Sequence, residues 1–228
     1  MTRHVLVIGA GIVGVSTAIW LLRAGAQVTL VDRQGPGEGT SHGNAGILAA
    51  AAVVPVTTPG LVRKAPGYLM DPNFPLFMRW LYLPKLAPWL IRFLSNANDT
   101  DTRRIAGALT PLLTDSVEQH KSLAVDLGLS DWITETDYCY AFEKRSDFEA
   151  QHYAWALRRE AGFVPQIIEG ADVRDYEPNI SDRIGMIAAL KEHGFIKDPG
   201  GYVRALAQAF EGMGGVVRQA EVKDFDLS

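Results

Sequence analysis

The stretch Val5-Leu6-Val7-Ile8-Gly9-Ala10-Gly11-Ile12-Val13-Gly14 decides the fold of this chain. Its first four residues form a continuous aliphatic run, which is typical of a parallel strand covered on both faces. Its last six match G-x-G-x-x-G, where the first glycine permits a tight turn, the second admits a pyrophosphate close to the backbone, and the third lets the next helix pack on the strand. The motif therefore predicts a turn whose helix amides bind phosphate groups.

The residues after this motif complete a βαβ unit. Apolar residues at helical spacing predict a helix over residues 12–24, ended by Gly25, and residues 27–31 are expected to form the second strand. Asp32 follows that strand, at the point where a carboxylate accepts hydrogen bonds from a ribose diol. A 2′-phosphate would meet this negative charge, so NADP is disfavoured, whereas NAD and FAD both remain compatible with Asp32.

A loop rich in Gly, Ser, Thr and Asn follows at residues 33–46. In a domain that binds NAD, we expect the sheet to continue promptly into another strand. Here the hydroxyl side chains of Thr40 and Ser41 and a set of small residues come first, and such a loop can run against a flat, bulky group. The loop therefore favours a flavin over a nicotinamide.

Two stretches of sequence carry a family resemblance, namely V-I-G-A-G-I-V-G-V-S-T-A at residues 7–18 and T-S-x-x-N-A-G at residues 40–46. A weaker match is H-G-F-I-K-D-P-G-G-Y-V-R-A-L-A at residues 193–207. Together they resemble the D-amino-acid oxidase superfamily of FAD-dependent oxidoreductases, and most closely its bacterial D-amino-acid dehydrogenases. The resemblance implies an α/β fold in which a Rossmann-like FAD-binding domain is interrupted by a mixed α+β substrate domain.

The resemblance also implies which residues contact FAD. The glycine turn and the residues after it would contact the pyrophosphate, and the end of the second strand would contact the adenosine ribose. The 40–46 loop would contact the phosphates and the flavin. A late strand would contact the adenine. In chain order, the predicted FAD-binding residues are Gly9, Gly11, Ile12, Val13, Gly14, Asp32, Arg33, Thr40, Ser41, Asn44, Ala45, Gly46, Ile47 and Val222.

His42 raises the question of a covalent flavin, since relatives that act on methylated glycines attach FAD through a histidine in this loop. In those relatives the histidine stands three residues before the last glycine of the motif, whereas His42 stands four residues before Gly46. We therefore predict noncovalent FAD.

The rest of the chain predicts further elements. We expect irregular chain over residues 49–67, two short helices within 70–94, helix over 99–128 with a break near Pro111, and strands over 132–143. A helix over 146–161 would start with Ser146 and Glu149 as a capping box. A short helix or turn at 170–178, a hairpin-like pair of strands at 184–190 and 194–196, a helix at 198–211 and a strand at 215–222 complete the pattern. The predicted domains are 1–68 and 197–228 for FAD, and 69–196 mostly for substrate.

The segment 70–94 combines many aromatic residues with three cations, Arg79, Lys85 and Arg92. One interpretation is that this stretch forms the apolar face of the substrate domain or a lid. The other is a peripheral contact with a membrane, where aromatic side chains lie at the interface and cations bind anionic lipid. Both alternatives remain open from the sequence.

The remaining candidate residues are interpreted as structural. Cys139, among aromatic neighbours, predicts a buried strand thiol in a reducing compartment. Tyr138, Tyr140, His193 and Tyr202 fit packing better than a substrate pocket. The charge runs at 143–145 and 158–160 fit exposed ends of elements. No metal-binding spacing occurs, and the net charge of -4 without a cationic cluster argues against nucleic acid.

The sequence and its family resemblance therefore predict an FAD-dependent dehydrogenase that oxidises the Cα–N bond of a small amine. The expected substrate is a D-amino acid, which would yield a 2-oxo acid and ammonia. A quinone is a candidate electron acceptor, and the expected location is cytoplasmic or peripheral at the inner face of the plasma membrane. No catalytic side chain is assigned. The alternatives are a sarcosine- or glycine-type oxidase and a noncatalytic nucleotide-binding fragment. Because relatives continue beyond the last strand, we expect an amino-terminal fragment that lacks the carboxy-terminal part.

Overall fold

The computed structural model describes residues 3–70 and 79–224 and divides into two compact units. Unit 1 contains the described residues of Met1–Leu48, Val117–Thr136 and His193–Ser228. Unit 2 contains those of Ala49–Ser116 and Asp137–Glu192. The boundaries of these units differ from the predicted domain boundaries near residues 68 and 196. The assignment of those predicted domains to FAD and to substrate stays a prediction.

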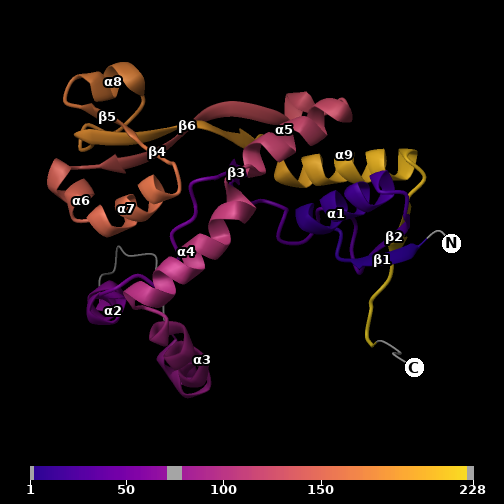
Figure 1. The fold of residues 1–228 in the computed structure, drawn as a ribbon, viewed down its shortest axis with the longest axis horizontal. Helices are drawn as coiled ribbons and strands as arrows, with labels where there is room; N and C mark the ends of the chain where they lie inside the picture. The colour runs from indigo at the N-terminus through magenta and orange to yellow at the C-terminus, as the bar shows by residue number, and fades with distance from the viewer. Residues whose placement is uncertain (1–2, 71–78, 225–228) are drawn as a thin grey trace. The chain divides into compact units, whose positions relative to one another are not determined.

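Unit 1 is built on a parallel three-stranded sheet in the order β1 (His4–Ile8), β2 (Gln27–Asp32), β7 (Val216–Gln219). Helix α1 (Ile12–Arg23) connects β1 to β2, and α9 (Pro199–Gly212) leads into β7. Figure 1 shows α1 and α9 side by side next to these strands. The predicted βαβ unit and the late helix are confirmed, while β7 ends three residues before the predicted strand end at Val222.

Helix α9 begins where its sequence predicts. The Asp198 carboxylate accepts a hydrogen bond from the Gly201 amide at 2.9 Å, and Pro199 occupies the first turn, where its missing N–H costs nothing. Tyr202, Leu206 and Phe210 recur at helical spacing and are fully buried. This stripe orients α9 and carries Tyr202 into the interior of unit 1.

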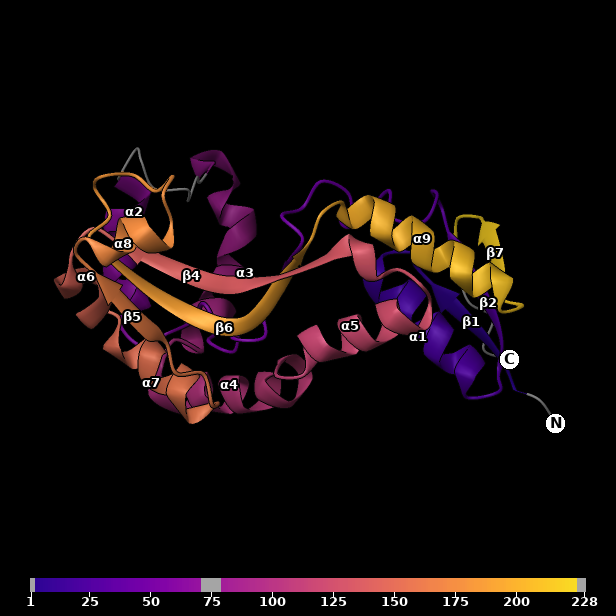
Figure 2. The ribbon, with the colours of Figure 1, turned by 90° about the horizontal axis from the view of Figure 1, so that it is seen from above.

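A second sheet has the order β3 (Ile47–Leu48), β6 (Met186–Ile196), β4 (Ile133–Phe142), with β5 (Gln166–Glu169) also paired to β6. Figure 2 shows the long strands β4 and β6 running beside each other. The predicted hairpin-like pair at 184–190 and 194–196 is wrong, because β6 is one strand. Glu192 adopts a φ of 62° within it, as in a β-bulge, and the strand continues instead of reversing.

Besides α1 and α9, the described residues form seven α-helices and two 3-10 turns. In chain order they are α2 (Leu61–Met70), η1 (Trp80–Tyr82), α3 (Leu83–Ser95), α4 (Asp99–Leu113), α5 (Ser116–Asp126), η2 (Ser130–Trp132), α6 (Arg145–Glu149), α7 (His152–Glu160) and α8 (Asp172–Tyr176). The predicted helical region with a break after Pro111 is confirmed by α4 and α5, and the short charged helix by α8.

Two helix predictions need correction. Residues 61–67, expected to be irregular, lie in α2, since a single proline removes only one backbone donor from a helix. The helix expected over 146–161 is divided into α6 and α7, and it starts earlier than the Ser146–Glu149 box requires. The Asp147 carboxylate, not that of Glu149, accepts from the backbone amide of Lys144, at 3.2 Å.

The prolines of the 70–94 segment do not divide it into the two short helices that were predicted. Pro84 lies in the first turn of α3 and Pro88 lies inside it, so a 13-residue helix follows the turn η1 where two short helices were predicted. Pro72 and Pro75, together with Phe74 and Phe77, lie outside the described residues.

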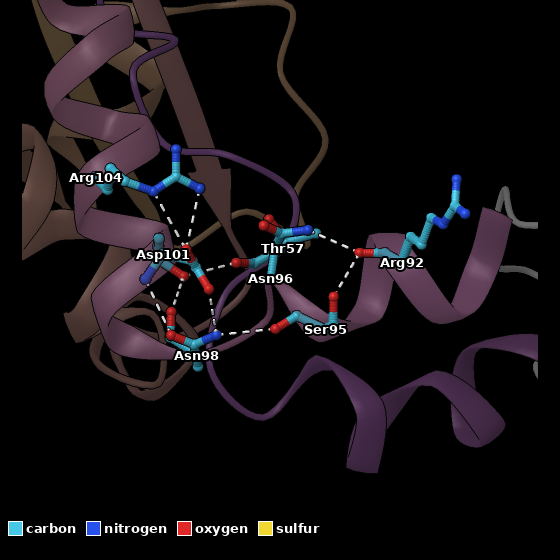
Figure 3. A network of polar contacts seen from close by, with 8 residues as sticks. Thr57, Arg92, Ser95, Asn96, Asn98, Asp101 and Arg104 are labelled. Carbon is cyan, nitrogen blue, oxygen red and sulfur yellow. Dashed lines mark hydrogen bonds and ion pairs between the residues drawn. The ribbon is translucent and has the colours of Figure 1, made fainter. Parts of the chain in front are cut away.

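The junction between α3 and α4 is held by polar side chains (Figure 3). Asn98 caps α4, because its side-chain oxygen accepts from the Asp101 amide at 3.0 Å. Its amide group donates to the Asp101 carboxylate at 2.8 Å and to the Ser95 carbonyl at 2.9 Å. Asn96 donates to the Arg92 carbonyl at 2.7 Å. These bonds satisfy carbonyls at the end of α3 and amides at the start of α4 with short local side chains.

The core of unit 2 lies between β4, β6 and the α6–α7 helices. Phe142, Phe148, Trp155, Met186 and Leu190 form it, with Tyr138 and Tyr140 packed at its edge. The packing role predicted for these tyrosines is therefore confirmed.

Strand alternation places Cys139 on the opposite face of β4 from the core residues. Its side chain is exposed, and its sulfur lies 3.6 Å from the Tyr176 hydroxyl. The prediction of a buried thiol is wrong because the aromatic neighbours at positions 138, 140 and 142 point to the other side of the sheet.

Arg158 also departs from the expectation of an exposed charge run, because it is only 8% exposed. Its guanidinium lies 4.5 Å from the Tyr140 ring centre and 4.7 Å from that of Trp155, and it donates to the Tyr140 hydroxyl at 2.8 Å. In the described part of the chain, its Nε and Nη1 have no hydrogen-bond partner. A buried cation that lacks a carboxylate is costly to desolvate.

We predict that Arg158→Met increases the free energy of unfolding, by about 1–4 kcal/mol, because methionine fills the site without a charge to desolvate. Chemical denaturation followed by circular dichroism measures this change. The matched control is Arg159→Met on the exposed side of the same helix, with an expected change within about 0.5 kcal/mol. A lower stability for Arg158→Met than for the control would contradict the prediction.

Candidate cofactor site

Three cavities of unit 1 lie next to one another, since each neighbouring pair shares lining residues. The first lies at the end of β2 and β7 and is bordered by Asp32, Arg33 and Val222. The second surrounds the glycine turn and shares Ile8 and Gly9 with the first. The third, of about 240 Å³, shares Ile12, Ser41 and Asn44 with the second. An elongated ligand can therefore extend from the end of the sheet across the start of α1.

Asp32 is fixed in the first cavity by two backbone amides. Its Oδ2 accepts from Ala10 at 2.7 Å, and its Oδ1 accepts from Gln34 at 2.9 Å. A carboxylate offers about four acceptor positions, so each oxygen retains capacity for a further donor such as a ribose hydroxyl. The bond to Ala10 also ties the end of β2 to the glycine turn.

The glycine turn requires its glycines for the reasons given by the motif. Gly9 adopts a φ of 102°, which favours glycine. A Cβ atom at Gly14 would overlap the carbonyl oxygen of Gly9, so only glycine allows α1 to lie this close to β1. At Gly11 a Cβ would approach the Ser41 hydroxyl oxygen to 3.3 Å. A side chain at Gly11 would therefore crowd Ser41 beside the second cavity, which both residues line.

The 40–46 loop is anchored on this turn and on β6. The Ile12 amide donates to the Ser41 hydroxyl oxygen at 3.1 Å, which joins the loop to the start of α1. Asn44 accepts from the Gly46 amide at 2.8 Å and donates to the Thr40 carbonyl at 3.2 Å. The Gly46 carbonyl accepts from the Ile196 amide at 2.8 Å. A strand about 150 residues away in sequence thus holds the loop in place.

The third cavity combines apolar walls with a few polar groups. Ile47, Leu48 and Ile196 supply apolar surface, and His120 and Tyr202 border it from α5 and α9. Burial lowers the pKa of His120 and raises the pKa of Tyr202 to about 12, so both side chains are neutral at pH 7. A mostly apolar cavity with a few polar groups is suited to a flat organic ring system and a hydroxylated chain.

The structure brings nearly all the predicted FAD-binding residues to the walls of these three cavities. The exception is Ala45, whose side chain is exposed outside them. His42 does not border them either and packs over Gly200. The role of the predicted FAD-binding residues in holding FAD stays a prediction, because no ligand contact tests it.

Sequence reasoning missed His120 and left Tyr202 unassigned as a ligand contact. Both reach the third cavity from segments far from the glycine motif, and each sits on a helix whose periodicity only indicates packing. No local signal marks them as neighbours of Ile12.

No group of three or more metal-ligating side chains occurs among residues 3–70 and 79–224. Over the same residues, none of the helices is both long and apolar enough to cross a membrane.

The parallel sheet, glycine turn and Asp32 define a dinucleotide-binding protein. The family model for FAD dependent oxidoreductase (DAO) matches residues 4–228, and the chain belongs to this family. The observed turn fits such a cofactor, since its three glycines line the second cavity without side chains and the fixed Asp32 carboxylate borders the adjoining cavity.

Similar proteins carry related names. The chain is 39% identical over 229 residues to a D-amino-acid oxidase of Bradyrhizobium diazoefficiens, covering 99% of this chain and 54% of that protein. It is 27% identical over 228 residues to a D-amino acid dehydrogenase of Helicobacter pylori, covering 100% and 54%. The glycine oxidase structure from Bacillus cereus has a TM-score of 0.59 at 18% identity, covering 100% and 49%, which shows a shared fold. The chain spans about half the length of the curated relatives it matches.

We predict that Asp32→Ala weakens FAD binding about 10- to 100-fold, because it removes a charged acceptor and releases the Ala10 amide. Titration of the protein into FAD, followed by flavin fluorescence, measures the affinity. Asp126→Ala, which breaks only the surface ion pair with Arg23 at 3.2 Å, is the matched control with unchanged affinity. Equal affinities for the two variants would show that Asp32 does not contact the cofactor.

Proposed function

We propose that unit 1 binds FAD along the three cavities, noncovalently, with adenosine beside Asp32, Arg33 and Val222, pyrophosphate at the glycine turn, and the flavin end beyond Ser41. The succession of the three adjacent cavities carries this proposal, since their order matches the order of groups along the cofactor. The exposed His42, packed over Gly200 and not bordering these cavities, supports noncovalent attachment.

We further propose that the protein oxidises the Cα–N bond of a small amine, with D-amino acids as the substrate class. Membership of the FAD-dependent family and its similarity to a D-amino-acid oxidase and a D-amino acid dehydrogenase support this activity. When bound, FAD supplies the acceptor for the two electrons removed from that bond. The residues of unit 1 bind and orient the cofactor, and apolar side chains such as Ile47 and Leu48 limit water at its flavin end. We propose that unit 2 contributes to the substrate domain.

The first test is whether the purified protein holds flavin. We expect a yellow protein, or a colourless one that FAD reconstitutes, with flavin absorbance bands and one FAD per chain. We expect FAD to bind in preference to NAD, because the third cavity, which lies next to the proposed phosphate site, has apolar walls suited to a flavin. Failure to bind FAD under any condition would overturn the proposal and leave a noncatalytic nucleotide-binding fold.

The second test separates the candidate reactions. With FAD-loaded protein, we expect D-alanine to reduce an artificial dye faster than sarcosine does, with little peroxide formed in air. Fast peroxide formation with sarcosine or glycine would instead identify an oxidase of the glycine type. FAD-loaded protein that reduces dye with none of these amines would contradict the proposed activity for this chain.

We propose in addition that the η1–α3 segment contacts a membrane and that a quinone accepts the electrons. Leu81 is 100% exposed, Ile91 69% and Trp80 64%, and no residue of α3 is buried. The exposed cations Arg79, Lys85 and Arg92 lie in the same stretch. Apolar side chains beside cations favour an anionic lipid surface over a role in the core.

Flotation with vesicles tests this contact. We predict binding to phosphatidylglycerol-containing vesicles that weakens at high salt, and at least a tenfold loss for the double variant Leu81→Ser and Ile91→Ser, whose apolar contacts with the bilayer are removed. Val62→Ser with Val164→Ser, also exposed in unit 2, is the matched control with unchanged binding. No binding of the unmodified protein would exclude the membrane contact.

A further inference from the structure

The interior of unit 1 contains polar atoms that nothing in the described chain satisfies. The Tyr202 hydroxyl, the Nδ1 of His120 and the Oγ of Ser16 are all buried without a hydrogen-bond partner. Leaving such an atom unpaired is costly, and buried polar atoms in folded proteins are nearly always paired. These three atoms therefore indicate places where a further hydrogen-bonding group belongs.

Two of these residues border the third cavity. Tyr202 is fully buried in α9, and the half-buried His120 projects from α5, with the two ring centres 6.0 Å apart. Ser16 does not border it. It lines a neighbouring cavity along α1 with Trp20 and Leu21, and the lining of that cavity also includes Ile12 and His120. The polar groups near the third cavity are thus Tyr202 and His120 from the helices, and Ser41 and Asn44 from the loop.

The position of the third cavity decides what reaches it. It adjoins the second cavity through Ile12, Ser41 and Asn44, on the side away from Asp32. In FAD, the group that follows the pyrophosphate is a polyol chain with several hydroxyls, and hydroxyls both donate and accept hydrogen bonds. A phenol and a neutral imidazole can each donate or accept as well, so these two side chains match a polyol in either direction.

We propose that Tyr202 and His120 hydrogen-bond the polyol of bound FAD and position the flavin end of the cofactor. This inference rests on the proposed binding of FAD in unit 1. It assigns a cofactor-positioning role to two residues that the glycine motif does not include, and it explains why the Tyr202 hydroxyl is retained without a partner inside the protein.

The test compares FAD with ADP, which carries the adenosine and the pyrophosphate but no polyol. For Tyr202→Phe and for His120→Leu we expect FAD affinity to fall about 3- to 10-fold each, as for one lost neutral hydrogen bond. The affinity for ADP should stay within twofold of the unmodified protein. Ser16→Ala removes the same kind of buried, unpaired hydroxyl beside the other cavity and should leave both affinities unchanged.

The Tm of the protein without cofactor distinguishes a role in FAD binding from a purely structural role, because the two roles predict opposite changes in this Tm. Tyr202→Phe deletes an unpaired hydroxyl, so we expect the ligand-free Tm to stay equal or rise, while the increase in Tm produced by FAD becomes smaller. A lower ligand-free Tm with an unchanged FAD increment would assign Tyr202 to packing and overturn the inference.

The outcomes separate this inference from the proposed function. If the unmodified protein binds neither FAD nor ADP, the proposed site itself is wrong. If it binds both, and Tyr202→Phe and His120→Leu bind FAD as tightly as Ser16→Ala does, only the polyol contact is wrong. An equal loss of FAD and ADP affinity in the two variants would also overturn the inference, because it would indicate general damage to the unit.

Discussion

The close approach of α1 to β1 is the constraint on which the rest of unit 1 depends. A side chain at Gly14 would overlap the Gly9 carbonyl oxygen, so the helix can start directly above the end of the strand only with glycine there. This approach places the start of α1, at Ile12 and Val13, beside the second cavity. The bond from the Ala10 amide to Asp32, at 2.7 Å, then fixes the carboxylate next to the same turn. The proposed phosphate and ribose contacts therefore depend on one local geometry.

The remaining parts of the site depend on contacts between distant segments. The 40–46 loop reaches its position because Ser41 binds the start of α1 and Gly46 binds β6 at Ile196. Helices α5 and α9 add His120 and Tyr202 to the same cavity. Three chain segments that are separated by most of the sequence are thus required to form one compact unit. The interruption of the nucleotide fold by another unit follows directly from this arrangement.

The parts predicted correctly from sequence are those governed by local chemistry. The β1–α1–β2 unit follows from a continuous apolar run, three glycines and helical periodicity, all within about thirty residues. The start of α9 follows from Asp198 and Pro199. The errors arise where a distant neighbour decides the outcome. Strand β6 passes through Glu192 without turning, because its first part pairs with β5 and its last part with β3. Arg158 is buried because the Tyr140 and Trp155 rings cover it, which its charged sequence neighbours do not indicate.

The central claim is that FAD occupies the three adjacent cavities from Asp32 to Tyr202 within unit 1. Hydrogen exchange with and without FAD tests it most directly, because each segment of the path carries backbone amides that can be followed by mass spectrometry. The account predicts slower exchange in peptides that cover residues 9–14, 32–34, 40–47 and 200–203, with little change in β5 and α8. Protection confined to unit 2, or no protection despite bound flavin, would contradict it.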